Sequence, residues 1–273
     1  MPEPVTLNPA DLHAPAGPEE LEAWCEQNQA PIEAGRKRIV ERAVVQAMAC
    51  HPELRSRFVL TGSVVLALFH GLPRITGDVD LRWDGPTATK EQQRLILSNV
   101  RRMLNEHIDR FLPAGDEWKD HARQLLAIQL SQGAGVTTSE RTVRLDLDGS
   151  NRLRVATPSG VAAMKIIATL RPVAIDNPRK HDLTDVAWML ENDLINVAEL
   201  RGDLSRLASV RSTRRTPAEL TDFQQRSVVA SREASQQRWQ PTSVTDGIEA
   251  VVQLTRLTGQ LTREAEAFSA SVA

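Results

Sequence analysis

The stretch FVLTGSVVLALFHGLPRITGDVDLRW, residues 58–83, decides the fold that we expect for this chain. Residues 58–60 are apolar and predict a short strand, which ends at a Gly62-Ser63 step and leads into an apolar turn of helix. A second predicted strand carries Asp78 and Asp80. Because side chains alternate across a strand and rise about 3.3 Å per residue, these two acids face the same side.

The acid pair predicts half of a divalent-metal site. Like charges this close raise each other's pKa unless a cation lies between them, and carboxylate oxygens suit Mg²⁺ or Mn²⁺. Backbone N–H groups at the predicted helix start, near Gly62 and Ser63, favour phosphate, and glycine permits a close approach. A nucleoside triphosphate fits both features. The alternative is a glycine that only permits a tight turn, with Asp78 and Asp80 as solvated edge residues.

Composition sets limits on the class of protein. The 273 residues are enough for one composite domain or two smaller ones, and a formal net charge of −2 argues against indiscriminate nucleic-acid binding. Only five of the 33 basic residues are Lys. This bias suits phosphate contacts, but a GC-rich genome is the favoured explanation. The two cysteines and the histidines show no metal-ligand spacing.

Hydrophobic periodicity outside the central stretch predicts a sheet covered by helices. We expect a helix around residues 39–48 that stops at His51-Pro52, and a long amphipathic helix over residues 89–112. Alternating residues predict strands at 124–131 and 142–148, joined by a flexible connector. The expected fold class is therefore α+β, with a small mixed sheet flanked by helices.

The sequence after residue 156 is nearly all helical in pattern. Thr157 is a predicted N-cap, and Pro158 is suited to the first helical position. We therefore expect two domains: residues 1–156, the catalytic core with an N-terminal helix, and residues 157–273, a helical domain.

Several motifs together resemble a known superfamily. Gly62-Ser63 followed by Arg74-x-Thr76-x-Asp78-x-Asp80 resembles the signature of the DNA polymerase β-like nucleotidyltransferases, in the form of the AbiEii/AbiGii toxin branch. Thr157-Pro158 with Lys165, and the segment from Arg179 to Asp185, are similar to two downstream motifs of that branch. The resemblance covers about residues 58–190 and implies the polymerase β-like core with a helical C-terminal domain.

What the resemblance implies is a metal-dependent enzyme that transfers a nucleotidyl group from an NTP and releases pyrophosphate. Such chemistry uses two Mg²⁺ or Mn²⁺ ions about 3.5–4 Å apart. The implied roles can be set out by kind: catalytic Asp78, Asp80, Lys165 and Asp182; nucleotide-binding Gly62, Ser63, Arg74, Thr76 and Lys165; metal-binding Asp78, Asp80 and a third acid, for which we favour Asp146 over Asp148.

Each downstream role has an alternative. Lys165, in an otherwise apolar helix, either contacts the triphosphate or extends its charged end to solvent. Asp182 is expected to orient Lys165 or the nucleotide, with Asp185 the less favoured acid; an ion pair with Arg179 or Lys180 competes. An Arg series over residues 201–215 suits an RNA backbone, or forms a solvated helix face that also bears Asp203.

The expected acceptor is RNA, by resemblance tRNA, with the chain acting as the toxin of a toxin–antitoxin pair and an antitoxin as partner. The alternatives are a protein or small-molecule hydroxyl as acceptor, or a degenerate member that only binds nucleotide. No apolar run reaches the roughly 18 residues of a membrane span, so we expect a cytoplasmic protein with no membrane partner.

Overall fold

The computed structural model describes residues 12–76, 78–85, 88–115, 118–119, 128–131, 135–145, 150–169, 180–209, 249–251 and 253–254. The chain divides into two compact units. The first comprises Met1–Gln132 and Thr138–Ala156, and the second comprises Gly133–Thr137 and Thr157–Ala273. None of the described helices is both long enough and apolar enough to cross a membrane.

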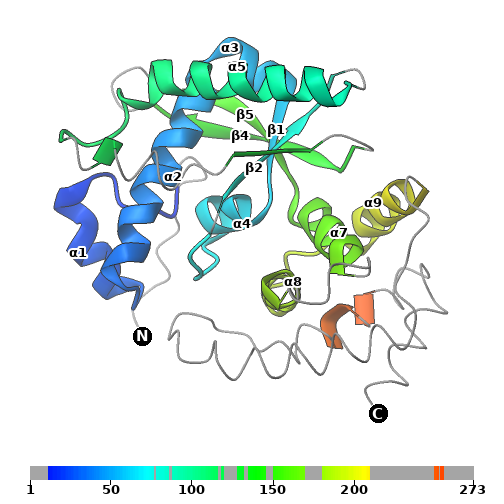
Figure 1. Ribbon diagram of the computed structural model, residues 1–273. Helices are drawn as coiled ribbons and strands as arrows, with labels where there is room; N and C mark the ends of the chain where they lie inside the picture. Colours follow the sequence, from blue (N-terminus) through cyan, green and yellow to red (C-terminus); the bar gives the residue numbers. More distant parts are fainter. Residues whose placement is uncertain are drawn as a thin grey trace. The chain divides into compact units, whose positions relative to one another are not determined.

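The first unit contains one mixed sheet and five helices among its described elements (Figure 1). In chain order they are α1 (Pro18–Gln27), α2 (Ile32–Cys50), α3 (Pro52–Arg57), β1 (Phe58–Thr61), α4 (Ser63–His70), β2 (Val79–Trp83), α5 (Lys90–Ile108), β3 (Ile128–Ser131), β4 (Thr138–Arg144) and β5 (Ser150–Ala156). The strand order across the sheet is β3-β2-β1-β5-β4. Strands β1 and β2 are antiparallel, β1 pairs with β5 and β2 with β3 in parallel, and β4 and β5 are antiparallel.

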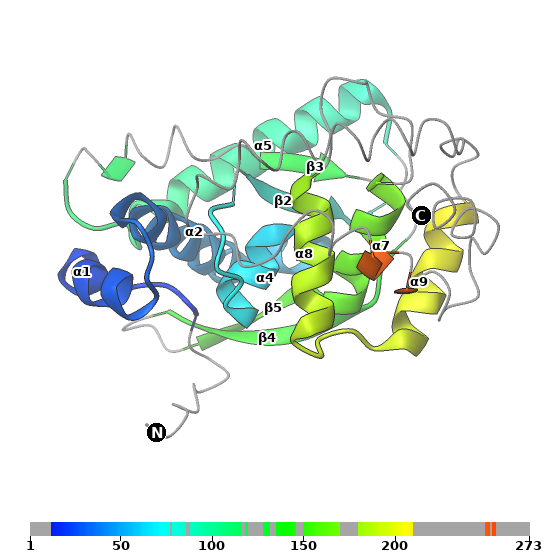
Figure 2. The same cartoon turned by 90° about the horizontal axis from the view of Figure 1, so that it is seen from below.

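The central strand explains where the core lies. All four residues of β1 are buried, because strands flank it on both sides and helices cover the sheet. Figure 1 shows α5 above the strands and α4 below them, and both views show α2 beside α5 (Figure 2). Along β2, Val79 and Leu81 are buried while Asp80 between them is half-buried; Arg82, the next residue, is buried as well.

Local sequence explains where two helices begin and end. Helix α2 ends before Pro52, since the residue that precedes a proline is disfavoured in helical conformation; His51 is extended at φ −85° and ψ 116°. Helix α5 begins with a capping box: the Thr89 hydroxyl accepts from the Gln92 N–H at 3.2 Å, and the Gln92 side chain accepts from the Thr89 N–H at 2.8 Å.

The structure corrects the expected strand at residues 142–148 and adds elements that the sequence did not predict. Residues 142–148 do not form one strand: β4 runs over Thr138–Arg144, beginning in the expected connector, and β5 follows at Ser150–Ala156. The pairing of Thr138 with Ala156 through Arg144 with Ser150 makes these two strands a hairpin. No separate helices were predicted at α1 and α3. The apolar stripe predicted along the amphipathic helix over residues 89–112 includes Leu95, which is 63% exposed and so does not belong to the buried face of α5.

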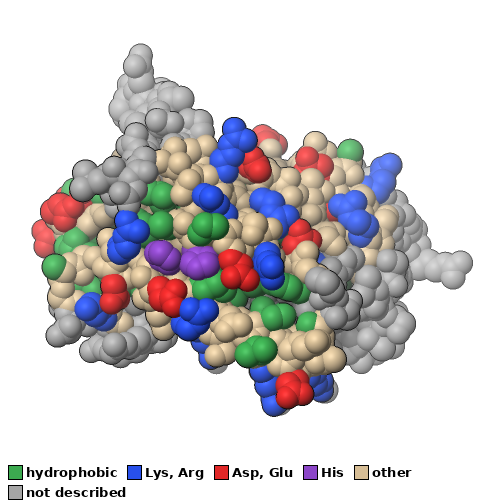
Figure 3. Space-filling view, turned by 90° about the horizontal axis from the view of Figure 1, so that it is seen from above, with side chains coloured by type: hydrophobic (Ala, Val, Ile, Leu, Met, Phe, Trp, Pro, Cys, Tyr) green, Lys and Arg blue, Asp and Glu red, His purple; other side chains and the backbone are tan. Residues whose placement is uncertain are grey.

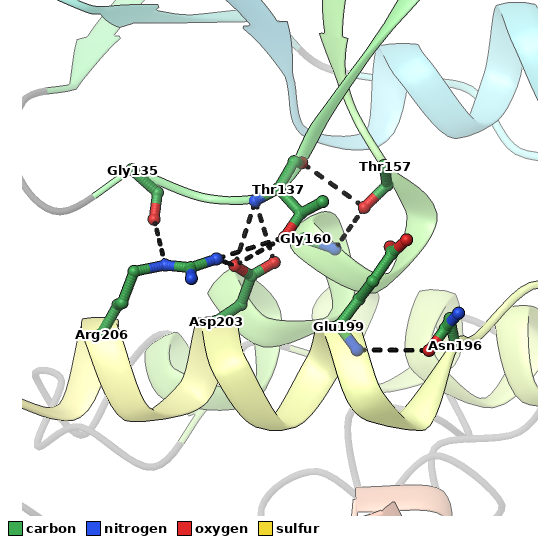
Figure 4. Close-up of polar contacts among 8 residues, drawn as sticks. All are labelled: Gly135, Thr137, Thr157, Gly160, Asn196, Glu199, Asp203 and Arg206. Atoms are coloured by element: carbon green, nitrogen blue, oxygen red, sulfur yellow. Dashed lines mark hydrogen bonds and ion pairs between the residues drawn. The ribbon is translucent and has the colours of Figure 1, made fainter.

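The second unit holds α7 (Pro158–Thr169), α8 (Lys180–Glu191) and α9 (Val197–Ser209) among its described residues. A buried carboxylate organises part of it (Figure 4). Asp203, on α9 and 0% exposed, accepts hydrogen bonds from the Thr137 N–H at 3.0 Å and the Thr137 hydroxyl at 3.1 Å, and it pairs with Arg206. Arg206 also donates to the Gly135 carbonyl at 3.2 Å. Asp203 is therefore not part of a solvated face, and Arg206 is held within its own unit.

A helical domain over all of residues 157–273 stays a prediction, as do the expected domain boundaries. The described residues of that range are helical except for residue 157 and the link at 192–196. Arg211, Arg214 and Arg215 of the Arg series lie outside the described residues.

Candidate active site

The junction between β1 and α4 brings Gly62 against Asp80. Thr61, the last residue of β1, is the register partner of Asp80 on β2, so the carboxylate of Asp80 projects at the point where the chain turns into the helix. A Cβ built on Gly62 would overlap Oδ2 of Asp80 and lie 2.9 Å from its Cγ. The glycine therefore makes the space that the carboxylate occupies.

Gly62 is required for its backbone as well. It has φ 76° and ψ −164°, a region that essentially only glycine populates. This conformation turns the chain from β1 into α4, and the N-cap position of that helix is Gly62 itself, which has no side chain to cap it. The Gly62-Ser63 step is therefore both a sharp turn and an N–H-rich helix start beside a carboxylate.

Arg74 links this turn to the loop before β2. Its guanidinium donates to the Ser63 hydroxyl at 2.6 Å and to the Ile75 carbonyl at 3.1 Å, and the residue is only 8% exposed. Ser63 and Arg74 were both predicted as nucleotide-binding residues, and their side chains are hydrogen-bonded to one another. The loop is thereby fixed to the helix start.

Two buried charges on α2 hold the same loop. Arg38 donates to the carbonyls of Leu72 at 2.9 Å and Arg74 at 2.7 Å, and to Glu41 at 2.6 Å. Glu41 in turn accepts from the Thr76 hydroxyl. Arg38, Glu41 and Thr76 are 3%, 4% and 1% exposed. The predicted nucleotide-binding residue Thr76 therefore bonds to a carboxylate of its own chain.

Arg38 and Glu41 were missed from the sequence, although a signal existed. They are three residues apart within a helix whose neighbours Ile39, Val40, Ala43 and Val44 are all buried. A charge of each sign at that spacing among buried residues predicts a satisfied internal pair rather than a solvated face.

Asp78 lies immediately before β2 and is half-buried, like Asp80. A cation on α2 lies near it: burial lowers the pKa of Lys37, while the charges of Glu41 and Asp78 raise it and those of Arg38 and Arg74 lower it. Lys37 is a second residue that the sequence did not single out. The loop and its two acids therefore lie near side chains of both charges. Burial disfavours the protonated state of Lys37.

A histidine at the end of α4 also has a strongly altered pKa. Burial, and after it the positive charges of Arg141 and His13, together lower the pKa of His70 to about 4. The guanidinium of Arg141 is 3.5 Å from Nε2 of His70. His70 is therefore neutral in the folded protein at neutral pH.

The second unit contains a buried ion triad. Nζ of Lys165, on α7, is 2.8 Å from Oδ1 of Asp182 and 2.8 Å from Oδ2 of Asp185, both on α8. The side chains of Lys165 and Asp185 are 8% and 1% exposed, and that of Asp182 is 16% exposed. Asp182 is the acid expected to orient Lys165, and the two side chains form an ion pair; the functional role stays a prediction. Asp185, which the sequence favoured less, is the more buried partner.

Asp146 and Asp148, the two candidates for the third carboxylate, lie outside the described residues, as does Arg179. The reason for preferring Asp146 was nevertheless wrong. It assumed a central place in a strand over residues 142–148, whereas β4 ends at Arg144.

The small mixed sheet, the Gly-Ser turn at the end of β1, and the acids Asp80 on neighbouring β2 and Asp78 just before it are the arrangement expected of a nucleotidyl transferase. Comparison with protein families agrees. The family described as nucleotidyl transferase AbiEii toxin, type IV TA system, matches residues 44–245, about three quarters of the chain. Comparison with curated protein sequences gave no match.

The chain belongs to the AbiEii nucleotidyl transferase toxin family of type IV toxin–antitoxin systems. It is therefore a nucleotidyl transferase toxin, and the expected class of enzyme is confirmed. Membership implies an NTP substrate and a partner antitoxin.

Proposed function

We propose that this chain transfers NMP from an NTP to a hydroxyl group of RNA, with Asp78 and Asp80 as ligands of the divalent ions that the reaction needs. The observation that carries the proposal is the contact between Asp80 and Gly62: a carboxylate lies against a residue without a side chain, at an N–H-rich helix start.

The residues present fit Mg²⁺ or Mn²⁺. Asp78 and Asp80 supply oxygen donors, which these hard cations prefer, and both acids are partly exposed, so that they are open to ions and to water. Bound ions would lower the pKa of the attacking hydroxyl and neutralise the leaving pyrophosphate. We keep Asp146 as the proposed third ligand on the resemblance alone.

The chain's own residues bind and orient the nucleotide in this proposal. The N–H groups at the start of α4, beside Gly62 and Ser63, bind phosphate oxygens, since a helix N-terminus favours negative charge. Arg74 fixes the Ser63 hydroxyl at 2.6 Å and adds a positive charge behind it. Thr76, through Glu41, holds the loop that carries Asp78.

Lys165 is the proposed phosphate contact from the second motif of the resemblance. Its support is chemical: a lysine that is 8% exposed needs compensation, and two carboxylates at 2.8 Å supply it and fix the direction of the amine. We propose Asp182 as the acid that orients Lys165, and we add Asp185 to this role.

The proposed acceptor of the NMP group is RNA. Family membership as a toxin, together with the resemblance, supports RNA, and tRNA in particular, over a protein or a small molecule. We propose that the reaction takes place in the cytoplasm, where NTPs and tRNA are found together, and that the cognate antitoxin counteracts it.

A labelling experiment tests these points together. Purified protein is incubated with each α-labelled NTP, Mg²⁺ and separate tRNA, protein and small-molecule fractions. We expect label on tRNA, at least about 100-fold less with Asp80→Asn, and undiminished label with Asp84→Asn, an exposed acid just past the same strand. Full transfer by Asp80→Asn would remove Asp80 from the mechanism, and label only on the protein or small-molecule fraction would exclude RNA as acceptor.

A further inference from the structure

A cluster of two histidines and a glutamate in the first unit has no part in the proposed transfer. His51 lies between α2 and α3, while Glu106 and His107 lie in the last turn of α5. Glu106 and His107 are adjacent to one another but lie 55 and 56 positions after His51, so sequence spacing gave no sign of the cluster. Figure 3 shows two histidine side chains side by side on the face that carries α5, with acidic and basic side chains around them.

The donor atoms converge. One ring nitrogen from each histidine and one carboxylate oxygen of Glu106 all lie within 4.8 Å of one another. The imidazole rings of His51 and His107 meet edge to face, with centroids 5.3 Å apart and an interplanar angle of 74°. His51 and His107 are half-buried and Glu106 is exposed, so the cluster is both held in place and open to an ion from solution.

One buried nitrogen on each of the two imidazole rings has no hydrogen-bond partner among the described residues. Nδ1 of His51 and Nδ1 of His107 are both buried and, among the described residues, neither has a partner. A buried polar atom without a partner is costly, and protein structures usually satisfy such atoms. Two unsatisfied nitrogens on adjacent rings beside a carboxylate point to a ligand that accepts electron pairs.

We propose that His51, Glu106 and His107 bind a transition-metal ion of the Zn²⁺ class, with water completing the coordination. Two imidazoles and one carboxylate form a donor set well suited to Zn²⁺, whereas Mg²⁺ prefers oxygen ligands alone. Tetrahedral Zn²⁺ with bonds near 2.0–2.1 Å needs donors roughly 3.4 Å apart, so small side-chain rotations from the present separation are sufficient.

The competing contacts are weak. Arg102 donates to Oε1 of Glu106 at 2.6 Å, but both side chains are about half exposed or more, and such surface pairs contribute little. A carboxylate also has a second oxygen. The ion would connect the α2–α3 junction to the end of α5, which pack together, and so stabilise the folded first unit.

Titration of the full-length protein with Co²⁺, without an affinity tag and in excess Mg²⁺, tests the proposal. Cobalt reports its own coordination by visible absorption and competes with Zn²⁺ for the same ligands. We expect one Co²⁺ per chain with a four-coordinate spectrum that Zn²⁺ abolishes. His51→Gln and His107→Gln should each weaken binding by at least about tenfold.

Matched controls keep the test decisive. Glu106→Gln, at an exposed position, is expected to weaken binding without affecting folding, whereas Glu91→Gln on the same helix and His181→Gln at an exposed site should bind Co²⁺ like the unaltered protein. Asp80→Asn should also retain the Co²⁺ spectrum. A failure of the proposed metal site is therefore distinguishable from a failure of the proposed NMP transfer. Absence of saturable Co²⁺ binding would overturn the proposal, and so would Co²⁺ binding by Glu106→Gln and His107→Gln as tight as that of the unaltered protein.

Discussion

Replacing Gly62 by alanine is the sharpest test of the candidate active site. The backbone of Gly62, at φ 76° and ψ −164°, lies where a residue with a Cβ is strained by about 1–3 kcal/mol. The added methyl group would also overlap Oδ2 of Asp80 and lie 2.9 Å from its Cγ, so the carboxylate must move. Overpacking of this kind adds about 1–3 kcal/mol. We therefore expect a large loss of NMP transfer together with a lowered free energy of unfolding.

A double-mutant cycle separates the two terms. In an Asp80→Ala background the carboxylate is gone, so Gly62→Ala should cost only the backbone strain, about 1–3 kcal/mol less than in the unaltered protein. Urea unfolding followed by circular dichroism measures both costs. If Gly62→Ala costs the same in the two backgrounds, the contact between Gly62 and Asp80 does not exist as described, and the reasoning about the site is refuted.

Gly71→Ala is the matched control for backbone strain. Gly71 ends α4 with φ 75° and ψ 26°, the left-handed conformation, and a Cβ there would lie 3.2 Å from the ring of His13. We expect a cost of about 1–2 kcal/mol from the backbone, with NMP transfer retained. Equal losses of transfer in Gly62→Ala and Gly71→Ala would show that strain in α4, rather than displacement of Asp80, is responsible.

Three further predictions concern buried charges. Lys165→Met should lower the free energy of unfolding by about 3–5 kcal/mol, because it leaves the carboxylates of Asp182 and Asp185 without this cation. Asp185→Asn should lower it by less, because the amine of Lys165 still pairs with Asp182. Urea unfolding measures both. Glu41→Gln should cost a similar amount to Lys165→Met, since Arg38 loses its buried partner. His70→Gln should flatten the loss of stability between pH 6.5 and 4, measured as thermal midpoint against pH.

The sign of the pH effect follows from the lowered pKa of His70. With a pKa of 6.5 when unfolded and about 4 when folded, the unfolded chain takes up the proton first, so stability is complete above pH 6.5 and falls as the pH approaches 4. The loss is at most about 3 kcal/mol, and partial exposure reduces it. An unchanged pH profile in His70→Gln would contradict this, and wild-type stability in Glu41→Gln or Lys165→Met would contradict the burial argument.

The local parts of the fold were predictable from the sequence, because their signals are local. The apolar run before Gly62, the helical stripe of α2 and the alternation around Asp80 each depend on residues within one turn or one strand. The hairpin of β4 and β5 was predicted wrongly because the prediction relied on local sequence patterns alone. Its strands carry exposed and charged residues, since it lies at the sheet edge, and alternation over 142–148 gave a stronger pattern than the true register.

The site was predictable only in its motif, not in its supports. Arg38 is 34 and 36 residues from the carbonyls that it bonds, and Glu41 is 35 residues from Thr76. Periodicity cannot reveal partners this far apart. The same limit applies to the ion triad, where sequence favoured Asp182 over the more buried Asp185.

The motif from Arg74 to Asp80 divides into two halves with different tasks. Arg74 and Thr76 are at most 8% exposed and bond to Ser63 and Glu41, whereas Asp78 and Asp80 are half-buried and open to solvent. These four residues are spaced two apart along the chain, so a regular strand would place all four side chains on one face. Because the loop before β2 is irregular, the first two side chains turn into the protein and anchor the segment. We infer that the spacing of the motif reflects anchoring as much as chemistry, since the acids keep their position only while both anchors hold.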